Sequence, residues 1–386
     1  MNARVARLGE LVEIRGGGTP SKDVPEYWNG PIPWVSVKDF KTTEIMRTVD
    51  TITAAGVANS ATNIIPAGNI LVPTRMAVGK AAINKAPMAI NQDIKALFPA
   101  SDVSVRYLLH ALLANGRVLE RMATGATVKG ITLDVLKALE IPLPSLEEQK
   151  RIAAILDKAD QLRQKRRQAI ALLDSLTQSI FLEMFGDPVS NPKQWQEATL
   201  GDVIYQASDG PHVSPQYCDD GIPFLSTRHI QRGAILWQDL KYISEEDAKL
   251  HWRKCKPQRG DLLYTKGGTT GIAAEVDFDE PFAVWVHVAL LKTRQDVVQP
   301  KWLECMLNSN YCYSQSQIYT HGIANRDLGL KRMVKIKLFL PPLEAQAAFV
   351  DNCASLERLI RRCELQLVEA DNLFLSLQHH AFSGQL

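Results

Sequence analysis

Four cations that recur in the two halves of the chain have the clearest potential chemistry. Lys38 and Arg75 correspond to Arg228 and Lys266, and each follows a short run of β-branched or aromatic residues. Phosphate binding requires Lys, Arg and exposed backbone N–H groups, whereas base recognition requires side chains that reach a groove edge. We therefore expect these cations to face DNA, with solvated surface residues as the alternative.

Three loops add hydroxyl, amide and backbone donors. Residues 16–22 form a Gly-rich loop beside Arg15, and loops 124–130 and 320–326 occupy equivalent places with different side chains. Such a difference is expected if one scaffold presents two recognition surfaces. The further DNA-binding candidates are Arg15, Gly17, Thr19, Lys22, Lys80, Thr127, Lys129, His229, Thr269, Asn325 and Arg326.

The sequence lacks the common catalytic and metal-binding patterns. It has no P-loop, no G-x-S-x-G, no H-E-x-x-H, and no G-x-G-x-x-G between a strand and a helix. Its six cysteines form no C-x-x-C pair, and the adjacent His379 and His380 lack a carboxylate or cysteine at metal-ligand spacing. We expect no catalytic residue and no metal in this chain. A self-contained DNA modification enzyme with an unrecognised active site is an alternative.

The overall charge does not favour nucleic acid. The net charge is +2, from 44 basic and 42 acidic residues, so any DNA-binding surface must be local. The first residues contain no apolar leader, and no stretch approaches the ~20 apolar residues that span a bilayer. We expect a cytoplasmic protein without membrane contact.

The second half of the sequence repeats the first. Residues 8–12 recur at 200–204, 30–38 at 221–228, 66–75 at 257–266 and 143–149 at 341–346. Each copy holds a globular part followed by a helical part. Two copies are too few for a solenoid, so they indicate a pseudo-two-fold molecule.

The globular parts contain both strands and helices. Short apolar runs bounded by Gly, Pro and Asn predict strands at 32–37, 70–72, 224–226, 262–264 and 283–291. Helical periodicity covers 105–120 and 300–309. The fold class is therefore α+β, without the alternation of a dinucleotide-binding domain.

A long helix follows each globular part. Ser145 and Glu148 form a capping box, and the chain then continues to Phe185 without Pro or Gly, which gives about 60 Å of helix. An apolar stripe predicts that this helix pairs with the second one as an antiparallel coiled coil. The predicted packing residues are Ile155, Leu162, Leu173, Leu176 and Ile180 in the first helix, and Leu356, Leu359, Leu373 and Leu377 in the second.

These elements divide the chain into four segments. We predict a first globular domain at 1–144, a central spacer helix at 145–187, a second globular domain at 188–342 and a C-terminal spacer helix at 343–386. A coiled-coil scaffold that binds only protein is a further alternative, which a DNA-binding measurement would separate.

Several motifs resemble those of a known family. Leu8-Gly9-Glu10, Gly17-Gly18-Thr19-Pro20, Ile32-Pro33-Trp34-Val35 and residues 141–152, followed by Phe185-Gly186-Asp187-Pro188, closely resemble the specificity subunit of type I restriction-modification systems. The resemblance extends into the second copy and covers essentially the full chain.

The resemblance implies a non-catalytic subunit. Each globular domain would recognise one half of an interrupted, asymmetric double-stranded DNA target, and the helices would fix the gap between the halves. The resemblance also implies two adenine methyltransferase subunits, which use S-adenosylmethionine, and ATP-dependent restriction and translocase subunits. No cofactor is expected in this chain.

Overall fold

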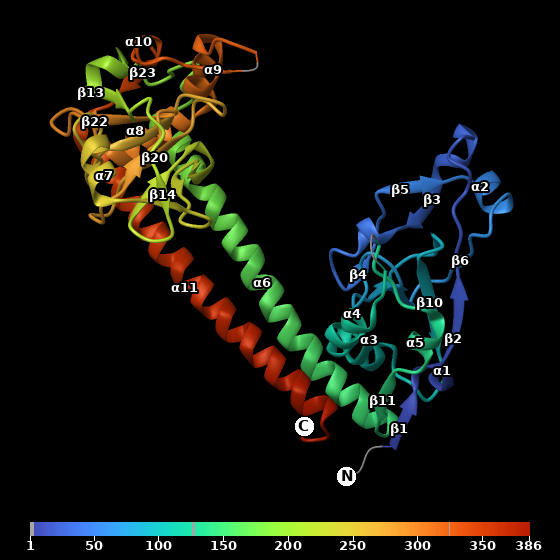
Figure 1. Ribbon diagram of the computed structural model, residues 1–386. Helices are drawn as coiled ribbons and strands as arrows, with labels where there is room; N and C mark the ends of the chain where they lie inside the picture. The colour runs from blue at the N-terminus through green and yellow to red at the C-terminus, as the bar shows by residue number, and fades with distance from the viewer. Residues whose placement is uncertain (1–3, 126–127, 324) are drawn as a thin grey trace. The chain divides into compact units, whose positions relative to one another are not determined.

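The computed structural model describes residues 4–125, 128–323 and 325–386. Its contacts divide the chain into two compact units. Unit 1 comprises Met1–Gln168 and Glu364–Leu386, and unit 2 comprises Ala169–Cys363. Each unit therefore holds one globular part and a segment of both long helices, which are green and red in Figure 1. The predicted domain boundaries at 144, 187 and 342 stay predictions.

Unit 1 combines short strands with short helices. Its strands are β1 (Arg4–Arg7), β2 (Val12–Gly16), β3 (Trp28–Val35), β4 (Glu44–Ile45), β5 (Asp50–Ile52), β6 (Ile64–Ile65), β7 (Ile70–Pro73), β8 (Ala82–Asn84), β9 (Met88–Ile90), β10 (Ile94–Pro99) and β11 (Glu140–Leu143). Its helices are α1 (Leu8–Leu11), α2 (Ala54–Ala58), α3 (Val105–Ala114), α4 (Gly116–Met122) and α5 (Leu133–Lys137), with 3-10 turns η1 (Pro25–Tyr27) and η2 (Val37–Asp39).

Two main sheets organise unit 1. One has the order β2-β10-β7-β8-β4 and the other β5-β3-β9-β6, while β1 pairs with β11. Ile70, Val72 and Leu97 of the first sheet pack against Tyr107 and Leu108 of α3 in the main core. The predicted helix at 105–120 is divided into α3 and α4, because Ser104 and Asn115 bound α3 and the chain redirects at Asn115.

Unit 2 has the same kinds of elements. Its strands are β12 (Gln196–Thr199), β13 (Ile204–Asp209), β14 (Tyr217–Cys218), β15 (Ile222–Leu225), β16 (Ile230–Gln231), β17 (Ala234–Ile235), β18 (Lys241–Ile243), β19 (Leu262–Thr265), β20 (Ala273–Glu275), β21 (Ala283–Val284), β22 (Val288–Thr293) and β23 (Lys337–Leu340). Its helices are α7 (Glu245–Trp252), α8 (Pro300–Asn308), α9 (Asn310–Tyr319) and α10 (Leu330–Met333), with 3-10 turns η3 (Leu200–Val203) and η4 (Thr227–His229).

Unit 2 repeats the central strand order of unit 1, without counterparts of β4 and β6 in these sheets and with β14 added. Its sheets have the orders β13-β22-β19-β20 and β14-β18-β15-β21, and β12 pairs with β23 as β1 pairs with β11. The parallel pair β3–β9 corresponds to the parallel pair β15–β21. The α+β tandem repeat is therefore confirmed. The single strand predicted at 283–291 is wrong, because the chain turns between β21 and β22.

The long helices are α6 (Leu146–Phe185) and α11 (Leu343–Phe382). A buried glutamine holds the start of each helix to its domain. Gln149 accepts from the Ser104 amide at 2.8 Å and donates to the carbonyls of Asp102 and Pro144. Gln346 makes the same set of bonds with Gln299, Val297 and Pro341. Because both the oxygen and the nitrogen of each glutamine amide are hydrogen-bonded, the side chain fixes the direction as well as the position of the helix start.

The two helices run antiparallel within unit 1. Arg163 Cζ lies 3.7 Å from the Phe374 ring centroid, and Arg167 Nη2 lies 2.9 Å from Asp371 Oδ1, so rising positions in α6 meet falling positions in α11. In unit 2, Phe181 of α6 packs against Phe349 of α11 with ring centroids 5.6 Å apart. Long-helix segments thus contact one another in each unit.

The predicted packing stripe is wrong at four positions. Leu162, Leu176, Leu359 and Leu373 are 52%, 41%, 46% and 54% exposed. Leu356 is buried, Ile180 and Leu377 are partly buried against the cores, and Ile155 and Leu173 are of intermediate exposure.

The buried stripe differs from the predicted one because each long helix packs against a globular part as well as against the other long helix. The buried residues include Leu156, Phe181 and Phe374, each one position after a predicted residue. One residue rotates a helical position by about 100°. Leu156 and Phe374 join the core that contains Tyr107 of α3, so the stripe turns toward the domain as well as the partner helix.

Among the residues that the structure describes, no helix combines the length and apolar character needed to cross a membrane.

Candidate nucleic-acid interface

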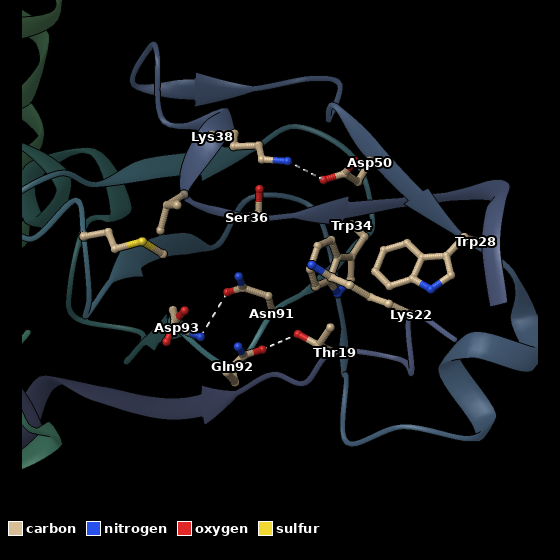
Figure 2. A pocket seen from close by; sticks show the side chains of 12 residues that line it. Thr19, Lys22, Trp28, Trp34, Ser36, Lys38, Asp50, Asn91, Gln92 and Asp93 are labelled. Atoms are coloured by element: carbon tan, nitrogen blue, oxygen red, sulfur yellow. Dashed lines mark hydrogen bonds and ion pairs between the residues drawn. The ribbon is translucent and has the colours of Figure 1, made fainter. Parts of the chain in front are cut away.

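The second sheet of unit 1 carries a hollow of about 470 Å³ with polar and aromatic lining residues (Figure 2). It lies where β3 and β9 run parallel and the chain leaves both strands. Residues from four separate stretches line it: Thr19, Lys22, Trp28, Trp34, Ser36, Val37, Lys38, Asp50, Met76, Asn91, Gln92 and Asp93. We call this the first hollow.

Local backbone bonds build the wall of the first hollow. Ser36 and Asp39 form a capping box, in which the Ser36 amide donates to Asp39 Oδ2 at 2.8 Å and turns the chain into η2. This turn carries Lys38 along the rim. Behind it, Trp34 donates from Nε1 to the Gly18 carbonyl at 3.1 Å and packs edge-on against Trp28.

Gly17 lets the Gly-rich loop approach β9. A Cβ atom at this position would lie 2.0 Å from the Ile90 carbonyl oxygen, and Gly18 donates its amide to that oxygen at 3.0 Å. The glycine is therefore needed for close backbone packing. This finding gives Gly17 a structural role beside the hollow, whereas its neighbour Thr19 lines the hollow itself.

The first hollow offers donors and acceptors together. Lys38 Nζ lies 3.4 Å from Asp50 Oδ2, and Thr19 donates to Gln92 Oε1 (Figure 2). Asn91 Oδ1 accepts from the Asp93 amide at 3.0 Å, which fixes the orientation of this side chain. Amide and carboxylate groups can accept from base amino groups, while Lys and the amides can donate.

Unit 2 has a hollow of about 250 Å³ at the same place in its fold. It is lined by Tyr217, Phe224, Ser226, Arg228, His229, Lys241 and Trp285, and we call it the second hollow. The pairing of the strands shows that the two hollows occupy equivalent positions. Trp34 pairs with Asp50 and Ala89, and Phe224 pairs with Lys241 and Ala283.

A related turn shapes the second hollow. The Ser226 amide donates to His229 Nδ1 at 2.9 Å, so His229 takes the place of Asp39 in the capping box. Burial and the charge of Arg228 lower the pKa of His229, which keeps the ring neutral at pH 7. His229 is only 3% exposed, so its predicted role as a free DNA contact is corrected to a structural one.

Two cations reach the second hollow. Arg228 donates from Nη2 to the Asp239 carbonyl at 2.6 Å, and Lys241 Nζ lies 4.1 Å from the Tyr217 ring centroid. The aromatic residues Phe224 and Trp285 pack edge-on behind them, with centroids 5.7 Å apart. This hollow therefore presents cations and rings where the first presents a mixture of charges.

Lys266 differs from its predicted role. Its side chain is 7% exposed, with Nζ 3.2 Å from Asp209 Oδ2 and 3.3 Å from Asp327 Oδ1. Burial raises the pKa of Asp209, but the bonds from Lys254 and Lys266 outweigh this effect and hold the pKa below its ordinary value. Lys266 is thus a buried ion-pair residue, and the expectation of a surface cation is corrected.

Lys266 was expected at the surface because the sequence alignment of the two copies was displaced by one residue at this strand. Thr74 O accepts from Ile131 N at 2.9 Å, and Lys266 O accepts from Leu328 N at 2.8 Å at the equivalent step. Lys266 therefore matches buried Thr74, and Gly267 matches Arg75. Because neighbouring strand residues face opposite sides, the shift moves a side chain from surface to interior. Arg75 is 56% exposed and lies 3.8 Å from Asp93 Oδ1.

Loops 124–130 and 320–326 are closed by equivalent backbone hydrogen bonds. Thr124 and Gly130 exchange two backbone bonds, as do His321 and Asp327. Gly125 and Gly322 both have positive φ, and a Cβ at either would lie 2.3 Å from the carbonyl three residues later. Lys129, Asn325 and Arg326 are exposed, whereas Thr127 lies outside the described residues.

The remaining candidates are spread over the surface of the two units. Arg15 stacks 4.5 Å from the Phe98 centroid and contacts Glu13, while Lys80 Nζ donates to the Phe40 carbonyl at 3.1 Å. Thr269 is exposed. Of all predicted residues, the first hollow gathers Thr19, Lys22 and Lys38, and the second gathers Arg228 and His229.

Sequence reasoning missed the partners of these cations. The lining residues that were not predicted include Asp50, Asn91, Gln92, Asp93, Tyr217, Lys241 and Trp285. Asp50 and Lys241 occupy the first residue of the strand that pairs with the Pro-containing strand in each copy. Because both residues occupy the same place in the two copies, an alignment of the copies could have identified Asp50 and Lys241.

Comparison with known proteins identifies the class. Residues 2–172 and 192–368 match the family described as type I restriction modification DNA specificity domain. The chain belongs to this family. Its members are non-catalytic specificity subunits, so the chain contributes DNA sequence specificity and the catalytic activities belong to partner subunits.

Individual relatives agree. The chain is 27% identical to the MjaIX specificity subunit of Methanocaldococcus jannaschii over 78% of this chain and 75% of the relative. It is 41% identical to the EcoR124I/EcoR124II specificity subunit of Escherichia coli over 40% of each chain. A solved type I S subunit from M. genitalium has a TM-score of 0.58 at 14% identity, covering 99% of this chain and 96% of that one.

A second solved chain, from work on assembly and conformational transition of the type I R-M system, has a TM-score of 0.63 at 19% identity. The match covers 100% of this chain and 98% of that one. At these identities the two structures support the fold.

Proposed function

We propose that this chain recognises an interrupted, asymmetric DNA target, with each globular domain recognising one half. The supporting observation is the pair of equivalent hollows with different linings. Trp34, Lys38 and Asp50 stand where Phe224, Arg228 and Lys241 stand in the other copy. A repeated scaffold with different donors and acceptors suits two different base sequences.

The long helices are the proposed spacer. Each spans 40 residues, which corresponds to about 60 Å at 1.5 Å per residue. Half-sites one DNA turn apart are separated by about 34–36 Å, so overlapping helices of this length can bridge them. The buried bonds of Gln149 and Gln346 favour this role, because a spacer requires helix ends that are fixed to their domains.

The proposed complex supplies the chemistry. The chain would direct two methyltransferase subunits, which bind S-adenosylmethionine, and restriction and translocase subunits, which use ATP, to the target in the cytoplasm. These cofactors would bind the partner subunits and not this chain. The name of the E. coli relative, a type I restriction enzyme specificity subunit, supports such an assembly.

Methylation mapping tests the proposal. Cells that express the partner subunits should methylate adenines in a two-part sequence only when this chain is also present. Single-molecule sequencing of their DNA, with and without the gene, measures this result. Methylation that is unchanged without the gene, or that the isolated chain performs alone, would contradict it.

A further inference from the structure

The equivalent hollows differ most at one position. Asp50 is opposite Trp34 in the β3–β5 pair, and Lys241 is opposite Phe224 in the β15–β18 pair. Both side chains line their hollows. One scaffold position therefore carries a carboxylate in unit 1 and an ammonium in unit 2, whereas the cation on the adjoining turn, Lys38 or Arg228, is kept.

The first hollow indicates which part of DNA this position faces. Asp50 and Asp93 both line it, and only Lys22 and Lys38 among the lining residues are basic. Lys38 Nζ already lies 3.4 Å from Asp50 Oδ2, so this cation is paired with a carboxylate. A phosphate would face as many carboxylates as ammonium groups, so the lining offers it no net attraction. A base edge with an amino group would instead find an acceptor in Asp50 and a donor in Lys38.

The second hollow has the opposite character. Arg228 and Lys241 line it, and no carboxylate is among its lining residues in the part of the chain that the structure describes. The guanidinium is held by the Asp239 carbonyl and lies beside His229, while Lys241 rests on Tyr217. Two held cations without a carboxylate beside them match the O6 and N7 acceptor pair of guanine in the major groove.

Resting on the proposed function, we propose that Asp50 and Lys241 are equivalent specificity-determining residues. Asp50 with Lys38 recognises an adenine or cytosine through its amino group, and Lys241 with Arg228 recognises a guanine. Because the fold places both positions alike, each residue governs one base in its own half of the target.

Exchange of the charge at position 241 tests this inference. Lys241→Asp, assembled with the partner subunits, should lower methylation of the native target about 10-fold or more. Mapping should show that guanine is no longer required at one position of one half-site, while the other half stays unchanged. Asp50→Lys should alter one position of the opposite half.

Two further variants keep the test decisive. Lys241→Met removes the charge without adding a carboxylate, so it serves if Lys241→Asp does not fold, and it should relax the same position. Lys335→Asp makes the same charge change at an exposed lysine outside the hollow and should leave the target unchanged. Thermal unfolding monitored by circular dichroism verifies that each variant is folded.

A phosphate contact would give a different result. Lys241→Met would then weaken binding equally at all sequences and reduce the salt dependence by about one phosphate, with the target unaltered. That outcome would overturn the inference. Absence of any sequence-specific methylation with the unmodified chain would instead reject the proposed function.

Discussion

Phe185→Ala is expected to lower the free energy of unfolding of unit 2 by about 3–5 kcal/mol. Phe185 is the last residue of α6 and has no exposed surface. Its ring lies 5.2 Å from Phe181, 5.6 Å from Phe349 and 6.0 Å from Trp302, measured between centroids. Alanine would leave a cavity among aromatic rings that join α6, α11 and the domain, which cannot close without moving all three.

Denaturant unfolding followed by tryptophan fluorescence measures this loss, because Trp302 contacts the altered site. Leu182→Ala is the matched control on the same helical turn. Leu182 is 43% exposed, so its truncation should change stability by less than about 1 kcal/mol. Equal effects of the two variants would show that the aromatic cluster does not hold the end of α6.

Gly17→Ala is expected to destabilise unit 1 by about 2 kcal/mol, because the new methyl group overlaps backbone. Its Cβ would lie 2.0 Å from the Ile90 oxygen and 2.6 Å from the Asn91 oxygen. Gly210→Ala should act alike in unit 2, where the Cβ would lie 2.3 Å from the Val284 oxygen. Since Asn91 and Trp285 line the two hollows, each variant should also weaken recognition of one half-site.

Gly16→Ala is the control for the first variant. The atom nearest to its added Cβ is Lys95 Nζ at 3.5 Å, which is ordinary contact with a flexible side chain. Thermal unfolding should therefore separate two substitutions that are adjacent in sequence. If Gly17→Ala were as stable as Gly16→Ala, the close approach of the Gly-rich loop to β9 would be refuted.

The repeat allowed much of the architecture to be predicted from sequence. The motif that contains Gln149 and Gln346 is preserved because both glutamines make the same buried bonds at the start of a long helix. β15 begins directly after Gly221, as local backbone preferences predict, whereas Gly30, Pro31 and Pro33 lie within β3. Local rules act within short segments, and a repeat is visible when the sequence is compared with itself, so both can be recognised without a structure.

Side-chain direction was harder to predict. Aligning Lys266 with Arg75 differs from the correct alignment by one residue, and strand alternation then reverses exposure completely. The helix stripe failed at Leu373 for a similar reason, because Phe374 lies on the buried face created by contacts with both α6 and the domain. In both cases the apolar pattern of the sequence fits the displaced alignment about as well as the correct one, so the sequence alone does not reveal the error.

The hollows could not be predicted from spacing. Thr19, Trp34, Asp50 and Asn91 meet only because β3 pairs with β5 on one side and runs parallel to β9 on the other. Parallel pairing joins distant segments, and no local signal specifies it. The cations were identified individually, whereas the acidic and aromatic groups that give each hollow its chemistry required the register.

Exchange of residues 1–144 for the corresponding segment of a relative with another target tests the central claim most directly. The hybrid, assembled with its partner subunits, should methylate a sequence in which one half is new and the other half is retained, as determined by single-molecule mapping of methylated adenines. Each domain would then act independently through its own hollow. A hybrid that is folded and active but changes both halves, or neither, would contradict the account.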